Sequence, residues 1–135
     1  MQIRNKKLHL DYEMLETIQS GIELFGFEVK ALRANQASLE GARVIVRGGE
    51  AYVVGLQIRP YQASNTPKSY QPDRTRRLLL KKSEILKLAT IDRQGLSLLP
   101  LSIYDSGNRI KLDLVMTKKK KKWDKREDLK KKWIE

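Results

Sequence analysis

Alternation of apolar and polar residues is clear in the middle of the chain. Residues 44–46 and 51–54 are β-branched and aromatic runs of the kind that form strands. Between them lie Gly48 and Gly49, which can adopt the positive φ angles of a tight hairpin turn without steric cost. The pattern therefore predicts an antiparallel hairpin over this part of the chain.

A second hairpin is predicted closer to the C-terminus. Residues 96–104 and 109–115 flank an Asp-Ser-Gly-Asn turn, and apolar residues of the later run alternate with charged ones. This alternation places Lys111 on the face turned away from the core. Residues 12–18 are also expected to form a strand, with an irregularity at Gly21, because a glycine inside a strand often marks a bulge or a barrel corner.

Two segments have the apolar spacing of short amphipathic helices, namely residues 28–33 and 83–92. Ser83 is the predicted N-cap of the second helix, and Gly95 ends it. Helices inserted between antiparallel hairpins indicate a mainly β fold, with a small closed barrel of the OB type as the first choice. Helices beside an open antiparallel sheet are the alternative.

A long segment with three prolines, residues 59–77, is predicted to be a loop. It contains five Lys/Arg residues against one Asp, together with Tyr61 and Tyr70. The two tyrosine rings could stack on unpaired bases of a nucleic acid. A solvated surface loop without a partner is the alternative.

Positive charge is concentrated at the C-terminal end. The chain of 135 residues has a formal net charge of +12, and residues 118–135 contribute half of it, with ten Lys/Arg against four Asp/Glu. Such a chain is expected to bind polyanions, nucleic acid first and acidic membranes second. A membrane partner is disfavoured, because a lysine run needs a lipid chain or an apolar helical face as a second anchor. We therefore divide the chain into one domain, residues 1–117, and a basic tail, residues 118–135.

The chain offers little material for catalysis. It contains no Cys and a single histidine, His9, which excludes thiolate metal sites and histidine clusters. Neither a nucleophile with its base, nor a carboxylate pair, nor a phosphate-binding glycine loop is recognisable. No enzymatic activity, metal or cofactor is therefore predicted. The chain also lacks a signal-peptide pattern and a long apolar run, which favours a cytoplasmic location.

Short motifs distributed over nearly the whole chain resemble the small protein B family of tmRNA-binding proteins, also called SsrA-binding proteins. Each motif alone is weak, whereas their shared order is specific. They lie at residues 5–7, 11–12, 21–33, 49–51, 58–60, 73–80, 84–85 and 124–126.

The resemblance implies a six-stranded antiparallel barrel of the OB type with about three short helices and a basic tail. It implies a monomer without catalytic activity that binds the tRNA-like domain of tmRNA. Together with alanyl-tmRNA, elongation factor Tu and GTP, it would enter stalled ribosomes in trans-translation. The tail, disordered when free, would become helical in the empty mRNA channel next to the small-subunit decoding region. A general RNA-binding OB domain or ribosome-associated protein is the first alternative, and an enzyme acting on RNA is the second.

The resemblance also implies particular contact residues. Gln19 stands where the family usually has an acid, and Lys119 stands where it carries glycine, which predicts a stiffer joint between barrel and tail. Glu28 would either contact RNA or support its helix, while Gly21 and Leu79 could instead be requirements of the backbone and the core. The implied tmRNA-binding residues are Gln19, Gly21, Glu28, Lys30, Arg33, Leu79 and Lys111, and the implied ribosome contacts are Lys118, Lys120, Lys121, Asp124, Lys125 and Arg126.

Overall fold

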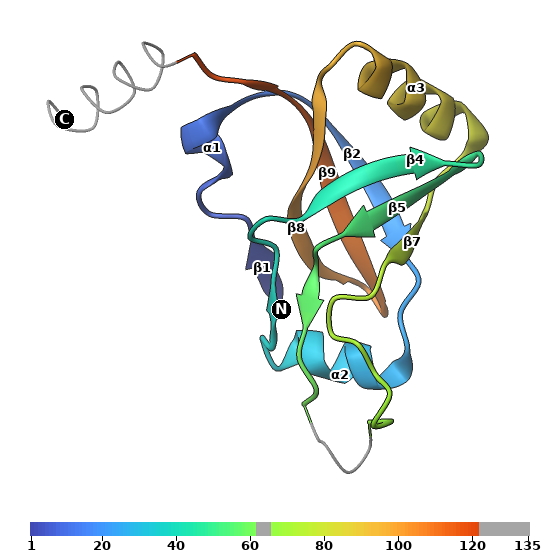
Figure 1. Ribbon diagram of the computed structural model, residues 1–135. Coiled ribbons are helices and arrows are strands. Elements are labelled where there is room, and N and C mark those ends of the chain that lie inside the picture. Colours follow the sequence, from blue (N-terminus) through green and yellow to red (C-terminus); the bar gives the residue numbers. More distant parts are fainter. Residues whose placement is uncertain (62–65, 122–135) are drawn as a thin grey trace, which may run out of the picture.

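Antiparallel strands dominate the computed structural model, which describes residues 1–61 and 66–121 (Figure 1). Seven strands form one sheet in the order β1-β8-β9-β2-β7-β5-β4, and two short strands, β3 and β6, form another. The elements are β1 (Gln2–Arg4), α1 (Leu8–Asp11), β2 (Tyr12–Ile22), α2 (Gly26–Arg33), β3 (Ala37–Ser38), β4 (Arg43–Arg47), β5 (Glu50–Val54), β6 (Gln57–Ile58), β7 (Arg76–Leu79), α3 (Lys82–Arg93), β8 (Ser97–Ser106) and β9 (Arg109–Lys119).

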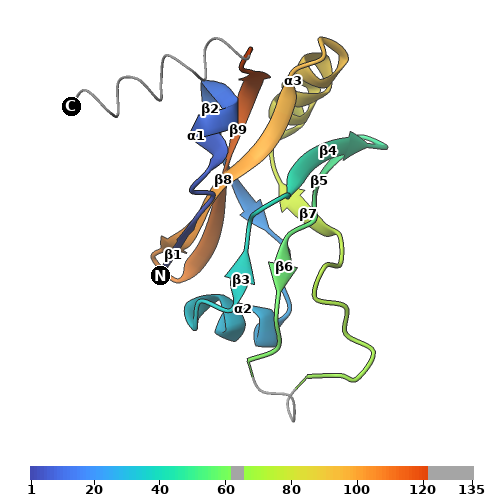
Figure 2. The same ribbon diagram turned by 60° about the vertical axis from the view of Figure 1, so that its left-hand side comes forward.

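The mainly β prediction and the three helices are confirmed, whereas the expected six strands are not. The main sheet has seven strands, because the short strands β1 and β7 join it as well. Strands of three and four residues are too short to show alternation in a sequence. The sheet is strongly curved, and β4 at one edge packs against β8 near the other edge (Figure 2).

Both predicted hairpins are present. β4 and β5 pair from Arg43 to Val54, and Gly48 and Gly49 have φ angles of +56° and +77° at the turn. These angles are the ones that a two-residue hairpin turn requires. β8 and β9 form the second hairpin, whose turn contains Gly107 with a φ angle of +63°.

The long strand β2 corrects the prediction for Gly21. The strand runs through Gly21 in regular pairing with β9, and the irregularity lies between Met14 and Glu16 instead. β9 continues to Lys119, which pairs with Tyr12, so two residues assigned to the tail belong to the sheet. Lys119 therefore stands in a strand, and this part of the predicted joint has β structure.

Helices α2 and α3 lie at opposite ends of the sheet in both views (Figures 1 and 2). Each begins with a glutamate in its first turn that accepts a hydrogen bond from the backbone N–H three residues earlier. Glu84 accepts from Lys81 at 2.9 Å, so the N-cap of α3 is Lys81 rather than the predicted Ser83. Glu28 accepts from Phe25 at the same distance in α2. The two glutamates satisfy backbone donors that helix starts leave unpaired.

The core lies between the helices and the inner face of the sheet. Leu32 of α2, Leu88 of α3 and Ile103 of β8 are fully buried, together with Leu112 and Leu114 of β9. The predicted alternation in β9 is confirmed by these two leucines, which flank a polar residue facing outward. Apolar burial of this kind supplies most of the driving force for folding.

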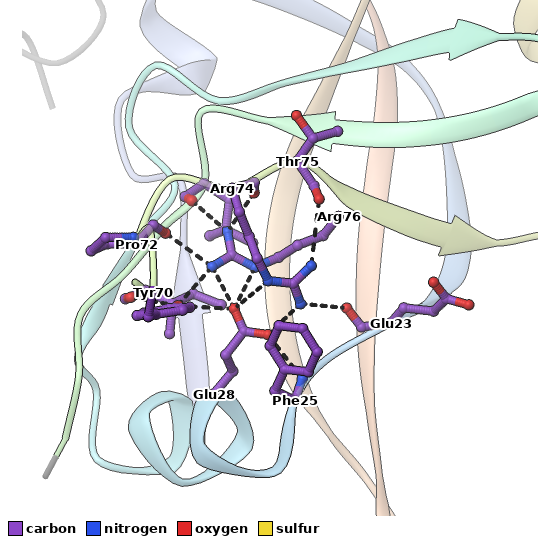
Figure 3. Close-up of polar contacts among 10 residues, drawn as sticks. Glu23, Phe25, Glu28, Tyr70, Pro72, Arg74, Thr75 and Arg76 are labelled. Atoms are coloured by element: carbon purple, nitrogen blue, oxygen red, sulfur yellow. Dashed lines mark hydrogen bonds and ion pairs between the residues drawn. The ribbon is translucent and has the colours of Figure 1, made fainter. Parts of the chain in front are cut away.

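A buried ionic cluster joins α2 to the start of β7 and to the segment before it (Figure 3). The side chains of Glu28 and Arg76 have no exposed surface, and their closest N–O distance is 2.6 Å. Arg74 donates to both carboxylate oxygens of Glu28, and the Tyr70 hydroxyl lies 2.9 Å from one of them. The other donors of Arg76 reach backbone carbonyl oxygens of Leu56, Pro72 and Arg74.

The cluster changes the interpretation of the long proline-containing segment. Tyr70 and Arg76, which the sequence placed in an RNA-accessible loop, point into the protein, and Arg76 begins β7. Burial raises the pKa of Tyr70 to about 12, aided by its hydrogen bond to Glu28, so this hydroxyl is neutral. Burial alone would raise the pKa of Glu28, but hydrogen bonds from Arg74, the Phe25 N–H and Arg76 outweigh it and lower the pKa.

Replacing Glu28 by glutamine should destabilise the protein strongly. The substitution keeps the side-chain size but leaves Arg76 buried without a counter-charge, which costs about 3 kcal/mol of unfolding free energy. Urea unfolding at pH 7 measures the difference. Glu84→Gln is the matched control, since Glu84 occupies the same capping position in α3 without an arginine partner, and it should cost less than about 1 kcal/mol.

The same comparison at lower pH isolates the contribution of charge. Because the folded-state pKa of Glu28 is lowered, its stabilisation is present above the unfolded value of about 4.3 and is lost as pH falls through the folded-state pKa. The gap between wild type and Glu28→Gln should therefore narrow below about pH 4. Equal losses for both variants at pH 7 would contradict a special role for this cluster.

Candidate nucleic-acid interface

Three of the predicted RNA-binding residues lie in one row across the sheet. Gly21 of β2 pairs with Lys111 of β9 on one side and with Leu79 of β7 on the other. A Cβ atom at position 21 would lie 3.1 Å from the Cβ atom of Leu79, which is tighter than most Cβ contacts and would require Leu79 to shift slightly. Glycine allows this close approach of the two strands without such a shift, and Leu79 is 47% exposed.

This row lines a shallow depression of about 390 Å³. Apolar side chains form most of it, and Lys111 and Arg109 supply positive charge from β9. An apolar surface beside cationic side chains suits RNA, which presents sugars and bases next to phosphates. The lining residues are Gly21, Ile22, Leu24, Val29, Leu79, Asn108, Arg109, Ile110 and Lys111.

Helix α2 brings two more of the predicted residues to the same end of the sheet. Val29 lines the depression, and the next residue, Lys30, is exposed. Arg33, one turn further on, donates to Asp105 at 3.4 Å, and Asp105 also pairs with the N-terminal ammonium group. Among the ion pairs of residues 1–61 and 66–121, none involves Lys30 or Lys111, so both cations are available to phosphate.

Gln19 is hydrogen-bonded to Tyr104, the residue that pairs with Lys111 of the row. Its amide donates to the Tyr104 hydroxyl at 2.7 Å, and this hydroxyl donates to Asp113 at 2.7 Å. The hydrogen bond from Gln19 lowers the pKa of Tyr104, but burial and Asp113 outweigh it and raise the pKa. In the sheet, Tyr104 is paired with Lys111 and Gln19 with Asp113. A neutral amide suits this position, because an acid at residue 19 would face the charge of Asp113.

Glu28 does not reach this surface. Its carboxylate is fully buried and bound by Arg74, Arg76 and the Phe25 N–H. Of the two roles that the sequence left open, support of the helix is the one that the structure shows.

Sequence reasoning missed three polar residues at this interface, namely Tyr104, Asn108 and Arg109. Arg109 and Asn108 line the depression from the β8–β9 turn, and Tyr104 lies opposite Lys111. The sequence feature that could have identified them is the predicted β8–β9 turn, which lies within a few residues of Lys111. Because the turn lies next to Lys111, residues in and beside the turn are also brought to the site.

Three of the predicted ribosome contacts, Lys118, Lys120 and Lys121, lie at the other end of β9 or directly after it. Lys118 pairs with Glu13, and the backbone N–H of Lys120 donates to Asp11 at 2.9 Å, beside α1. Lys118 lies seven residue steps along the strand from Lys111, which corresponds to roughly 23 Å. Lys121 is exposed, and Asp124, Lys125 and Arg126 lie outside the described residues. Along β9, the structure therefore separates Lys111 from the described members of the predicted ribosome set.

Other kinds of site receive no support from the part of the chain that the structure describes. Within it, no group of three or more His, Cys, Asp or Glu side chains is placed to bind a metal ion. No helix within residues 1–61 and 66–121 has the length and apolar character needed to cross a membrane.

Comparisons with known proteins find similar chains and a similar solved structure. An SsrA-binding protein of Nostoc punctiforme is 42% identical over 127 residues, covering 93% of this chain and 82% of the relative. An SsrA-binding protein of Thermosipho africanus is 43% identical over 132 residues, covering 96% of this chain and 88% of the relative. A chain from a solved structure described as "tmRNA-SmpB: a journey to the center of the bacterial ribosome" is similar with a TM-score of 0.73 and 36% identity, covering 90% of this chain and 85% of that one.

The family-level match extends over almost the full length, from residue 2 to residue 135, and includes both the sheet row and the lysine-rich end. Its breadth agrees with the order of the short motifs along the sequence. The chain belongs to the SmpB protein family.

Proposed function

We propose that this protein binds tmRNA through the depression around Gly21 and acts as an adaptor in trans-translation. The observation that carries the proposal is the row formed by Leu79, Gly21 and Lys111, in which a glycine creates an apolar hollow next to an uncompensated cation. Relatives that are more than 40% identical are SsrA-binding proteins, and the similar solved structure concerns tmRNA, SmpB and the ribosome.

The protein acts by binding and not by catalysis. Cationic residues on β9 and α2 neutralise phosphates of the tRNA-like domain, while the apolar hollow excludes water from the contact. The chain of hydrogen bonds from Gln19 to Asp113 fixes Tyr104 beside Lys111, so the cation is presented from a rigid surface. No cofactor or metal is needed for such a contact.

The opposite end of β9 contacts the ribosome in this proposal. Lys118, Lys120 and Lys121, with Asp124, Lys125 and Arg126 beyond them, face the decoding region and the empty mRNA channel. Alanyl-tmRNA arrives with elongation factor Tu and GTP, and one cytoplasmic monomer occupies each complex. A rigid OB-type barrel then holds the two RNA contacts at a constant separation.

The proposal predicts selective binding of one RNA. In a competition assay at near-physiological salt, the tRNA-like domain of tmRNA should displace a labelled tmRNA probe better than ordinary tRNA or an unrelated hairpin. Shape recognition by the depression is the reason, since charge alone would favour all three RNAs equally. Equal competition would instead support the general RNA-binding alternative.

Lys111→Ala should weaken tmRNA binding through the loss of a phosphate contact. The slope of log affinity against log salt concentration should fall in magnitude by about 1, as expected for one phosphate contact. Lys87→Ala is the control, because Lys87 lies on α3 and is paired with Glu16. An unchanged slope for Lys111→Ala would place the phosphate contact elsewhere.

Deletion of residues 122–135 should separate RNA binding from ribosome rescue. The cut preserves β9 and its pairing with β2, which a cut at residue 118 would disturb. Affinity for tmRNA should remain within about threefold, because few of the proposed phosphate contacts are lost. Tagging of stalled peptides in a purified translation system should be abolished. Parallel loss of affinity and tagging would show that this segment is a main RNA anchor.

A further inference from the structure

An exposed aromatic ring lies next to the proposed RNA surface and is held in one orientation. Phe25 is 51% exposed, although it directly precedes α2. The guanidinium carbon of Arg74 lies 4.2 Å from the centre of its ring (Figure 3). The ring of Phe27 packs against it at 5.4 Å with an interplanar angle of 27°. Exposed apolar residues are common, but few are clamped by a cation and a second ring.

The clamp is itself anchored in the buried ionic cluster. Arg74 donates to both oxygens of Glu28 and to the backbone carbonyl of Glu23 at 3.4 Å. Glu28 is fixed in turn by Arg76, whose side chain is fully buried. The orientation of Phe25 is therefore established by folding, and a ligand would not have to order the ring.

The cluster also leaves a positive charge next to the ring. Glu28 contributes one negative charge, and Arg74 and Arg76 contribute two positive charges, while Tyr70 is neutral. The side chain of Arg76 has no exposed surface and that of Arg74 is 24% exposed. The excess charge is therefore presented to solvent at Arg74, which favours an anionic ligand that also carries a flat apolar group.

The position of the ring relates it to the RNA contact. Leu24, the residue before Phe25, lines the same depression as Gly21 and Lys111. Phe25 is therefore the direct chain neighbour of a residue that lines the depression. An unpaired base has a free face for stacking on an aromatic side chain. Paired bases are already stacked within a helix and leave little free base surface for an aromatic ring.

We propose that Phe25, clamped by Arg74, is a stacking site for one unpaired base of the bound RNA. This inference rests on the proposed binding of tmRNA. It adds a base contact to an interface that otherwise consists of phosphate and shape recognition.

The test compares Phe25→Ala and Phe25→Tyr with the wild-type chain, using the tRNA-like domain of tmRNA as the probe. Phe25→Ala should lower affinity about tenfold, within the range for loss of one stacked base, without a change in salt slope. Phe25→Tyr keeps the ring and should bind within about twofold of wild type. Leu86→Ala is the matched control, since Leu86 is an exposed apolar residue on α3 at the other end of the sheet.

A second measurement identifies the base and excludes a merely structural effect. Abasic substitutions are introduced one at a time at the unpaired positions of the probe. At one position, the abasic RNA should bind wild type about tenfold more weakly and should bind Phe25→Ala with no further loss. Additive losses at every position, or full affinity of Phe25→Ala, would overturn the inference. In either case the wild-type competition assay tests tmRNA selectivity separately, so failure of the stacking site and failure of the proposed function are distinguishable.

Discussion

The buried carboxylate of Glu28 is the constraint on which this end of the molecule depends. It lies between two arginines and a tyrosine that come from residues 46, 48 and 42 positions later in the chain. Burying ions is costly, and such a cluster stabilises a fold only when every donor is satisfied. Here the donors of Arg76 are met by Glu28, Tyr70 and backbone carbonyl oxygens. The cluster fixes the position of α2, because Glu28 must meet both arginines when the helix docks. The cations of α2 therefore have fixed places relative to β9.

The sheet imposes a second constraint, which links the two proposed RNA contacts. Lys111 and Lys118 lie on the same strand, and β9 pairs with β2 on one side and β8 on the other over most of its length. A strand held on both sides does not bend easily, so the separation between these lysines is constant. In an adaptor with two RNA partners, binding of the first RNA near Lys111 would therefore fix where Lys118 meets the second RNA.

The sequence predicts local features well and long-range packing poorly. Turn glycines and alternation were sufficient for the hairpins β4–β5 and β8–β9, because both signals lie within a few residues. Of the two local explanations for Gly21, a bulge or a barrel corner, the bulge is wrong, and its close neighbour Leu79 is 58 residues away and paired with it. Family motifs located Gly21, Leu79 and Lys111 without explaining why they meet. They also included Glu28, whose contacts with Arg74 and Arg76 cannot be inferred from spacing.

Glu28 illustrates how a buried acidic residue can support a basic surface from within the protein. The guanidinium groups of Arg74 and Arg76 bind the same carboxylate and would repel each other without it. Neither group would then keep a fixed orientation. A single carboxylate between them removes the repulsion but cancels only one of the two positive charges. Because Arg76 is buried and Arg74 is partly exposed, the remaining charge is presented at the surface and not in the core. A neutral residue at position 28 would leave the two arginines without the acceptor that orients them. A second acid nearby would cancel the remaining positive charge. One buried acid with two arginines meets both requirements.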